Sequence, residues 1–116
     1  MLRARDAASG VIIAEELRLA HTHWTRLKGL LGTRTLDHSC GLWLKPCNQV
    51  HMFGMRYAID VVFLDDAGHT LRLIHGLKPW RISPRVRRAT GVLELPAGTI
   101  TRSGLQVGAR IIIEPS

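Results

Sequence analysis

Alternating apolar and polar positions predict that this chain is built mainly of short β-strands. The most strand-like segment is 57–65. Its two faces are Tyr57, Ile59, Val61 and Phe63 on one side, and Ala58, Asp60, Val62 and Leu64 on the other. Because both faces are apolar except at Asp60, we expect this strand to be covered on both sides.

Other segments carry weaker strand patterns, separated by turn residues. They are 2–6, 11–20, 42–44, 50–53, 70–75, 91–95 and 109–114. Glu15 interrupts an apolar face, which predicts a bulge or bend near Glu15-Glu16.

Two stretches have helical character. Residues 22–31 begin with Thr22, which can cap a helix, and carry an apolar stripe that includes Trp24 and Leu27. A single helical turn is expected over 99–103. The fold class predicted from these patterns is mostly β (α+β): a small antiparallel, barrel-like, β-rich domain with one main helix near residues 22–31.

Length and composition agree with this picture. The 116 residues predict one domain over 1–116, and 46% hydrophobic with 22% charged residues is typical of a folded chain and not of a disordered one. No apolar run exceeds four residues, so we expect no transmembrane helix and no membrane insertion, and we assign the chain to the cytoplasm.

The formal net charge of +7 is partly local. Five basic residues fall within eleven positions that contain no acid: Lys78, Arg81, Arg85, Arg87 and Arg88. Such a patch suits phosphates or nucleic acid, although a solvated basic loop explains it as well. Only Trp80 is available there to stack on a base, and no recognition-helix pattern accompanies the charges, so nucleic-acid binding is the runner-up.

Several short blocks together resemble one family. They are Arg26 with Gly29-Leu30, Pro46-Cys47, His51-Met52-Phe53-Gly54-Met55, Ile59-Asp60-Val61-Val62-Phe63, and the LELPAG block at 93–98. In combination they resemble domain-of-unknown-function family 192 (DUF 192), a group of small prokaryotic proteins. The resemblance implies a compact β-rich domain with little helix and assigns no activity.

A metal site is one chemical alternative. His38, Cys40, Cys47 and His51 lie within fourteen residues and offer a Cys2His2 ligand set for zinc. The spacing lacks the C-x2-C knuckle common in structural zinc sites, so we predict no metal and no cofactor. Two cysteines do not indicate a disulfide framework.

An enzyme is a second alternative. Cys47 and His51 offer a nucleophile and a base, with Asp60 as a further polar group. A small packed thiol is the simpler interpretation of Cys47, and whether the protein is an enzyme stays open.

Asp60 is the most unusual residue, because an ionised carboxylate in an apolar strand needs a cation or hydrogen-bond donors. In one hypothesis it belongs to a ligand-binding pocket. The pocket residues are His51, Phe53, Met55, Arg56 and Asp60. In the other, which we favour, Asp60 bonds backbone amides of the Gly54 or Gly98 turn.

The sequence therefore favours a small binding domain. Its partner is a small or extended ligand or another protein, contacted near His51, Arg56 and Asp60. The alternatives are an enzyme using Cys47, His51 and Asp60, and a phosphate- or nucleic-acid-binding module using residues 78–88.

Overall fold

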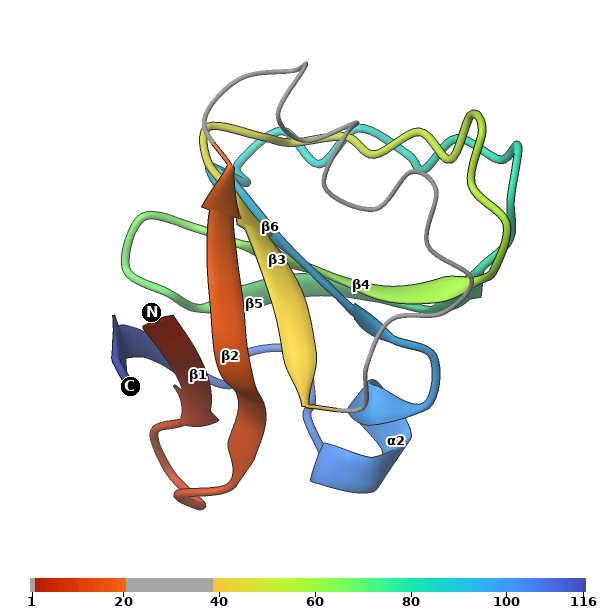
Figure 1. Ribbon diagram of the computed structural model, residues 1–116. Coiled ribbons are helices and arrows are strands. Elements are labelled where there is room, and N and C mark those ends of the chain that lie inside the picture. The colour runs from red at the N-terminus through yellow and green to blue at the C-terminus, as the bar shows by residue number, and fades with distance from the viewer. Residues whose placement is uncertain (1, 21–38) are drawn as a thin grey trace.

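A computed structural model describes residues 2–20 and 39–116, which form one curled sheet with a short helix (Figure 1). The strands are β1 (Leu2–Asp6), β2 (Ile12–Ala20), β3 (Cys40–Leu44), β4 (Ile59–Leu64), β5 (Thr70–Leu77), β6 (Gly91–Pro96) and β7 (Ile111–Pro115). The helix is α2 (Thr99–Ser103), which ends at Gly104. The mostly β, barrel-like fold class predicted from the sequence is confirmed.

All seven strands belong to one sheet in the order β5-β4-β6-β3-β2-β1-β7. Neighbouring strands are antiparallel except β2 and β3, which pair in parallel. Between β1 and β2 the register slips, because Leu2 pairs with Leu17 but Ala4 pairs with Ala14. One extra residue lies at Glu15-Glu16, where the interrupted apolar pattern predicts a bulge, and a second shift follows where Arg5 pairs with Ile12.

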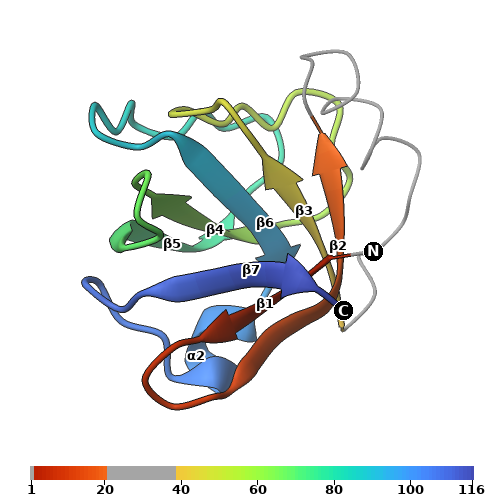
Figure 2. The ribbon, with the colours of Figure 1, turned by 90° about the vertical axis from the view of Figure 1, so that its left-hand side faces the viewer.

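The sheet curls until its two ends approach one another. His69, before β5, forms an isolated bridge with Arg110, before β7. The amide of Thr70 donates to the Ala109 carbonyl at 2.8 Å, and the amide of Ile111 donates to the Gly68 carbonyl at 2.8 Å. Figure 2 shows the start of β7 close to the turn between β4 and β5. These bonds close the barrel-like curve at one end.

Both faces of the sheet are buried, and each has its own hydrophobic core. The inner core includes Val62, Leu64, Leu93, Leu95, Ile100 and Leu105, and it is closed by α2. The outer core includes Ile59, Val61, Phe63, Val92, Met52 and Met55. All six residues of β4 are buried, as expected for a strand covered on both sides.

The cover of the outer core comes from two segments that we call the outer layer, residues 45–58 and 78–90. Val50, Met52, Met55 and Ala89 bury their side chains from this layer into the outer core. Figure 1 shows the layer along the top of the molecule and α2 at the bottom. Core packing thus holds a layer without regular strands against the sheet.

Most strand predictions agree with the structure within two residues. Segment 50–53 is an exception, since only His51 forms a bridge, to Ile82, and no regular strand is present there. The helix predicted over 22–31 lies outside the described residues. Among the described residues, no helix is long and apolar enough to cross a membrane.

Asp60 ties α2 and the end of β5 to β4. Its side chain is 1% exposed and lies on the inner face with Val62 and Leu64. Oδ1 accepts from the amide of Gly76 at 2.9 Å. Oδ2 accepts from the amides of Gly98 at 3.1 Å and Ile100 at 2.9 Å. Gly98 has no side chain to cap the helix, so the carboxylate of a distant strand takes that role. Of the two turns predicted to supply donors, the Gly98 turn does so, and Gly54 is not among the donors to Asp60.

Substitution of Asp60 by Asn should therefore destabilise the fold. One carboxylate oxygen becomes an NH2 donor, which faces buried amide donors instead of accepting from them. We expect the free energy of unfolding to fall by about 3 kcal/mol. Urea denaturation measures it, with Asp66→Asn as the control, because Asp66 is an exposed carboxylate near the same strand. Equal stability of Asp60→Asn and the wild type would contradict this role.

A second carboxylate, Asp65, organises the turn between β4 and β5. Its Oδ1 accepts from the amides of His69 at 2.8 Å and Ala67 at 3.0 Å. The hydrogen bond from the His69 amide is the main cause that holds the pKa of Asp65 below its usual value of 3.8, and the His69 imidazole adds a favourable charge. Oδ2 lies 3.7 Å from Nδ1 of that imidazole.

The lowered pKa of Asp65 gives its contribution to stability a defined pH dependence. Because the folded pKa lies below the unfolded one, the stabilisation is present above the ordinary pKa of 3.8 and is lost as the pH falls through the folded value. Asp65→Ala should thus have a lower melting temperature than the wild type at neutral pH, and the two should converge in acid. Thermal unfolding measured from neutral pH down to about pH 2.5 checks this. A difference that stays constant with pH would refute it.

Candidate functional site

The two segments of the outer layer pair with each other as an irregular antiparallel ribbon. The amide of Cys47 donates to the carbonyl of Thr90 at 3.1 Å, and the amide of Met52 donates to the carbonyl of Arg81 at 2.8 Å. The amide of Trp80 donates to the carbonyl of Met52 at 2.8 Å. Val86 and Ser83 donate to the carbonyls of Asn48 and Val50 at 2.9 and 2.8 Å. The layer is therefore fixed by its own hydrogen bonds as well as by the core beneath it.

Side chains alternate between the two sides of this ribbon. Val50 and Met52 are buried in the outer core, whereas His51 and Phe53 point away from it. The His51 ring stacks on the Phe53 ring, with centroids 5.1 Å apart and an interplanar angle of 28°. The period of two that defines a strand thus places two adjacent rings on the outside of the ribbon.

One end of the ribbon carries a group of large side chains that we call the aromatic tip: the exposed Phe53, Trp80 and Ile82, and the half-buried His51. Trp80 is 67% exposed, Ile82 55% and Phe53 44%. The Phe53 and Trp80 ring centroids lie 6.1 Å apart with an interplanar angle of 38°. Exposed large apolar side chains that cluster often mark a contact surface.

The backbone at Trp80 is strained. Its φ is +68°, and among the described residues it is the only one other than glycine with a positive φ. The Arg81 amide donates to the Lys78 carbonyl at 3.3 Å, so Lys78-Pro79-Trp80-Arg81 forms a turn with proline second and a positive φ third. These features are those of a type II turn, whose third position favours glycine. A bulky residue there costs on the order of 1–3 kcal/mol.

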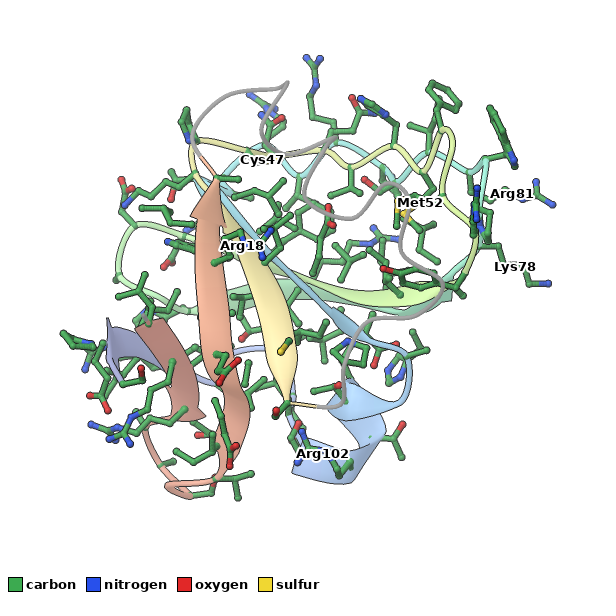
Figure 3. All side chains as sticks on the ribbon, in the orientation of Figure 1. Arg18, Cys47, Met52, Lys78, Arg81 and Arg102 are labelled. Carbon is green, nitrogen blue, oxygen red and sulfur yellow. The ribbon has the colours of Figure 1, made fainter. Side chains whose placement is uncertain are left out.

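The outer layer is also strongly basic. Its cationic residues are Lys45, Arg56, Lys78, Arg81, Arg85, Arg87 and Arg88, all of them exposed. Neither segment of the layer contains an aspartate or glutamate. Among the residues that the structure describes, no carboxylate lies within ion-pair distance of these seven. Figure 3 shows Lys78 and Arg81 projecting from the end of the layer, far from Arg102 beside α2.

The residues of the predicted pocket are divided between the two sides of the sheet. His51 and Phe53 lie on the outside of the outer layer, Arg56 is exposed, and Met55 is buried beneath the layer. Asp60 faces the inner core, where its carboxylate accepts three backbone hydrogen bonds. The structure thus brings His51 and Phe53 together and places Asp60 elsewhere.

The three residues of the enzyme hypothesis have separate surroundings. The Cys47 thiol donates to the carbonyl of Gln49 at 3.2 Å, while the His51 ring stacks on Phe53. Asp60 lies on the other face of the sheet from both. A nucleophile and base need to be within hydrogen-bond reach, and the separation of Asp60 from this pair leaves it no direct role in such chemistry.

The ligand set considered for zinc is only partly described. His38 lies outside the described residues. Cys40 opens β3 and Cys47 follows the end of that strand, so the length of β3 separates the two thiols. The Cys40 thiol lies 3.6 Å from Oε2 of Glu16. Within residues 2–20 and 39–116, no group of three His, Cys, Asp or Glu side chains is arranged to hold a metal ion.

Sequence reasoning selected Trp80 as a residue able to stack, but it missed the aromatic tip as a group. Phe53 and Trp80 are far apart along the chain, and only the pairing of the two segments makes them neighbours. A local signal was present in Pro79-Trp80, because proline favours the second position of a turn whose third position often takes a positive φ.

Comparisons with known proteins agree with the motif blocks. The model of family DUF192, described as an uncharacterized ACR, matches residues 4–113. A UPF0127 protein of Pyrococcus furiosus is 40% identical over 109 residues, covering 91% of this chain and 93% of the relative. A UPF0127 protein of Thermococcus sibiricus is 27% identical over 111 residues, covering 91% of this chain and 71% of the relative.

A solved structure shows the same fold. It is a crystal structure of a proposed transcription regulator from Sinorhizobium meliloti 1021, with a TM-score of 0.80 over 96% of this chain and 90% of the other. Its sequence identity is 24%, so the likeness concerns the fold alone. The family match over residues 4–113 and the 40% identical relative establish that the chain belongs to the DUF192 family.

Proposed function

We propose that this protein is a binding domain for an extended polyanion, and that the outer layer is its contact surface. The observation that carries the proposal is the position of the net charge. The whole chain has 16 basic and 9 acidic residues, and the outer layer holds seven of the basic and none of the acidic ones. The remainder is balanced, with nine of each, so the entire formal charge of +7 belongs to one layer.

Such a concentration of charge has a physical cost. Like charges on one surface repel each other, and no described carboxylate compensates them. A polyanion removes this repulsion on binding and releases its condensed counterions, which makes association favourable and dependent on salt. Five of the seven cations are arginines, whose planar guanidinium groups can bond phosphate or sulfate oxygens in pairs.

The shape of the layer suits an extended ligand better than a small one. The ribbon from Cys47 to Phe53 spans roughly 20 Å at the rise of an extended chain. Its cations lie along both paired segments and not around one concave point. The proposal keeps His51, Phe53 and Arg56 from the predicted pocket as parts of this surface. It extends the phosphate-binding alternative from residues 78–88 to both segments.

Reversing charge in the layer should weaken binding to a model polyanion. In Arg87→Glu/Arg88→Glu, two cations become anions, so the variant should elute from immobilised heparin at clearly lower salt. Its affinity for long-chain inorganic polyphosphate should fall by about tenfold or more, with a less steep dependence on salt. A salt gradient on the heparin resin and a titration with polyphosphate at several salt concentrations measure these effects.

The matched control is Arg72→Glu/Arg110→Glu. It changes the net charge by the same amount at exposed residues outside the outer layer, and its melting temperature is measured alongside, because Arg110 donates to the Ala67 carbonyl at 3.2 Å. If both double variants lose retention equally, the interaction follows net charge alone and the proposed surface is wrong. If the wild type is not retained at low salt, the proposed function fails.

A further inference from the structure

We infer that the polyanion is a single-stranded nucleic acid whose bases stack on the aromatic tip. This inference rests on the proposed function, because it takes the outer layer as the surface that meets phosphates. It adds a second contact of different chemistry. Proteins that bind single strands combine a cationic track for the backbone with aromatic side chains on which bases stack.

The aromatic tip has the geometry of a stacking platform. The Phe53 ring contacts both the His51 ring and the Trp80 ring, with centroids 5.1 and 6.1 Å away. A base inserted between two parallel rings needs them roughly 6.8 Å apart, twice the stacking distance of about 3.4 Å. Phe53 and Trp80 are closer than that and tilted by 38°. The bases are therefore expected on the outer face of Trp80, which is 67% exposed.

The backbone at Trp80 argues that this ring serves more than the fold. A turn with a positive φ is formed most easily by glycine, and the indole at this position buries little surface in return. Strain held at an exposed side chain is typical of functional sites. Within the described residues the indole contacts the Phe53 ring, and stacking on a base would cover the surface that this contact leaves exposed.

The charges and rings are arranged for one continuous strand. Lys78 and Arg81 flank Trp80 in the same turn, and Arg85, Arg87 and Arg88 follow along the paired segment. A backbone that runs along this segment has phosphates near the arginines and delivers its bases to the outer face of Trp80 at the end. Figure 3 shows Lys78 and Arg81 at this end of the layer, with Met52 directed beneath it.

Other polyanions lack one part of this match. In a duplex the bases are stacked inside the helix, so the rings of the tip have no exposed base face to contact. Heparin and polyphosphate offer charge without bases. An anionic membrane offers charge and an apolar layer but no bases to stack on the indole, and vesicles are therefore included in the test.

The experiment compares oligonucleotides of one mixed 20-nucleotide sequence as single-stranded DNA, single-stranded RNA and duplex DNA. Fluorescence anisotropy of the labelled strands gives the affinities. Vesicles that contain about one third phosphatidylserine are the membrane probe, measured by co-sedimentation. We expect a single strand to bind at least about tenfold more tightly than the duplex. The comparison of single-stranded DNA with single-stranded RNA shows whether the 2′-hydroxyl contributes to the affinity.

Two variants isolate the stacking contribution. Trp80→Gly removes the ring and places the residue that the turn favours, so the melting temperature should stay equal or rise while single-strand affinity falls by about tenfold. Phe53→Leu keeps an apolar side chain without a π face, and it should weaken binding less. Trp80→Tyr should retain most of the affinity, because tyrosine also offers a ring. None of these variants should change elution from heparin.

The outcomes separate this inference from the proposed function. Retention on heparin with equal affinity for single strand and duplex overturns the inference and leaves the proposed function standing. The same holds if Trp80→Gly binds single strands as well as the wild type. Vesicle binding that depends on Trp80, without single-strand binding, overturns it in favour of a membrane partner. If the wild type binds neither heparin nor any of the oligonucleotides, both the inference and the proposed function are refuted.

Discussion

Three backbone amides, one near the end of β5 and two at the start of α2, meet at the carboxylate of Asp60, and the arrangement of the rest of the molecule depends on that contact. The amides of Gly98 and Ile100 hold α2 against the inner face of the sheet, where it closes the inner core. The amide of Gly76 lies near the end of β5, just before the chain enters the outer layer at Lys78. One buried group therefore fixes both the inner cover of the sheet and the point at which the outer cover begins. Since each amide would otherwise be an unpaired polar group near the core, the interaction is cooperative with folding.

The curled sheet separates structural and surface roles between its two sides. The inner side is a closed core in which polar groups serve the backbone, as Asp60 does. The outer side is covered by a layer whose buried side chains are mainly apolar and whose exposed side chains include the seven cations and the aromatic rings of Phe53 and Trp80. Because Val50 and Met52 anchor this layer in the outer core, the outward side chains are presented on a well-packed support. A rigid support limits the entropy that those side chains lose when they make a contact.

The aromatic tip departs from the local sequence–structure preferences that the rest of the structure follows. Elsewhere the positive φ values of the described residues fall on glycines, and carboxylates form turns or ion pairs, as at Asp65 and Glu114. At Trp80 a bulky residue occupies a glycine position and its ring faces solvent. Proteins that are locally consistent everywhere else tend to break such rules at functional sites. The strained turn, the stacked rings and the unbalanced charge coincide in one layer, which is why the binding role is assigned to it.

The sequence by itself determined the strands, because a period of two in hydrophobicity reports directly which residues share a face of a pleated chain. It also identified Asp60 as a carboxylate that needs donors, named the Gly54 or Gly98 turn as their source, of which the structure shows Gly98, and predicted the bulge at Glu15-Glu16. Strand parity does not reveal which face of the sheet a neighbouring loop covers. Nearness along the chain therefore suggested that His51, Arg56 and Asp60 share a pocket, whereas the fold places His51 and Asp60 on opposite faces. Only the tertiary structure decided that segments 45–58 and 78–90 pair, and that Phe53 meets Trp80. These contacts join residues far apart in sequence, and they form because both segments bury their apolar side chains over the same outer core.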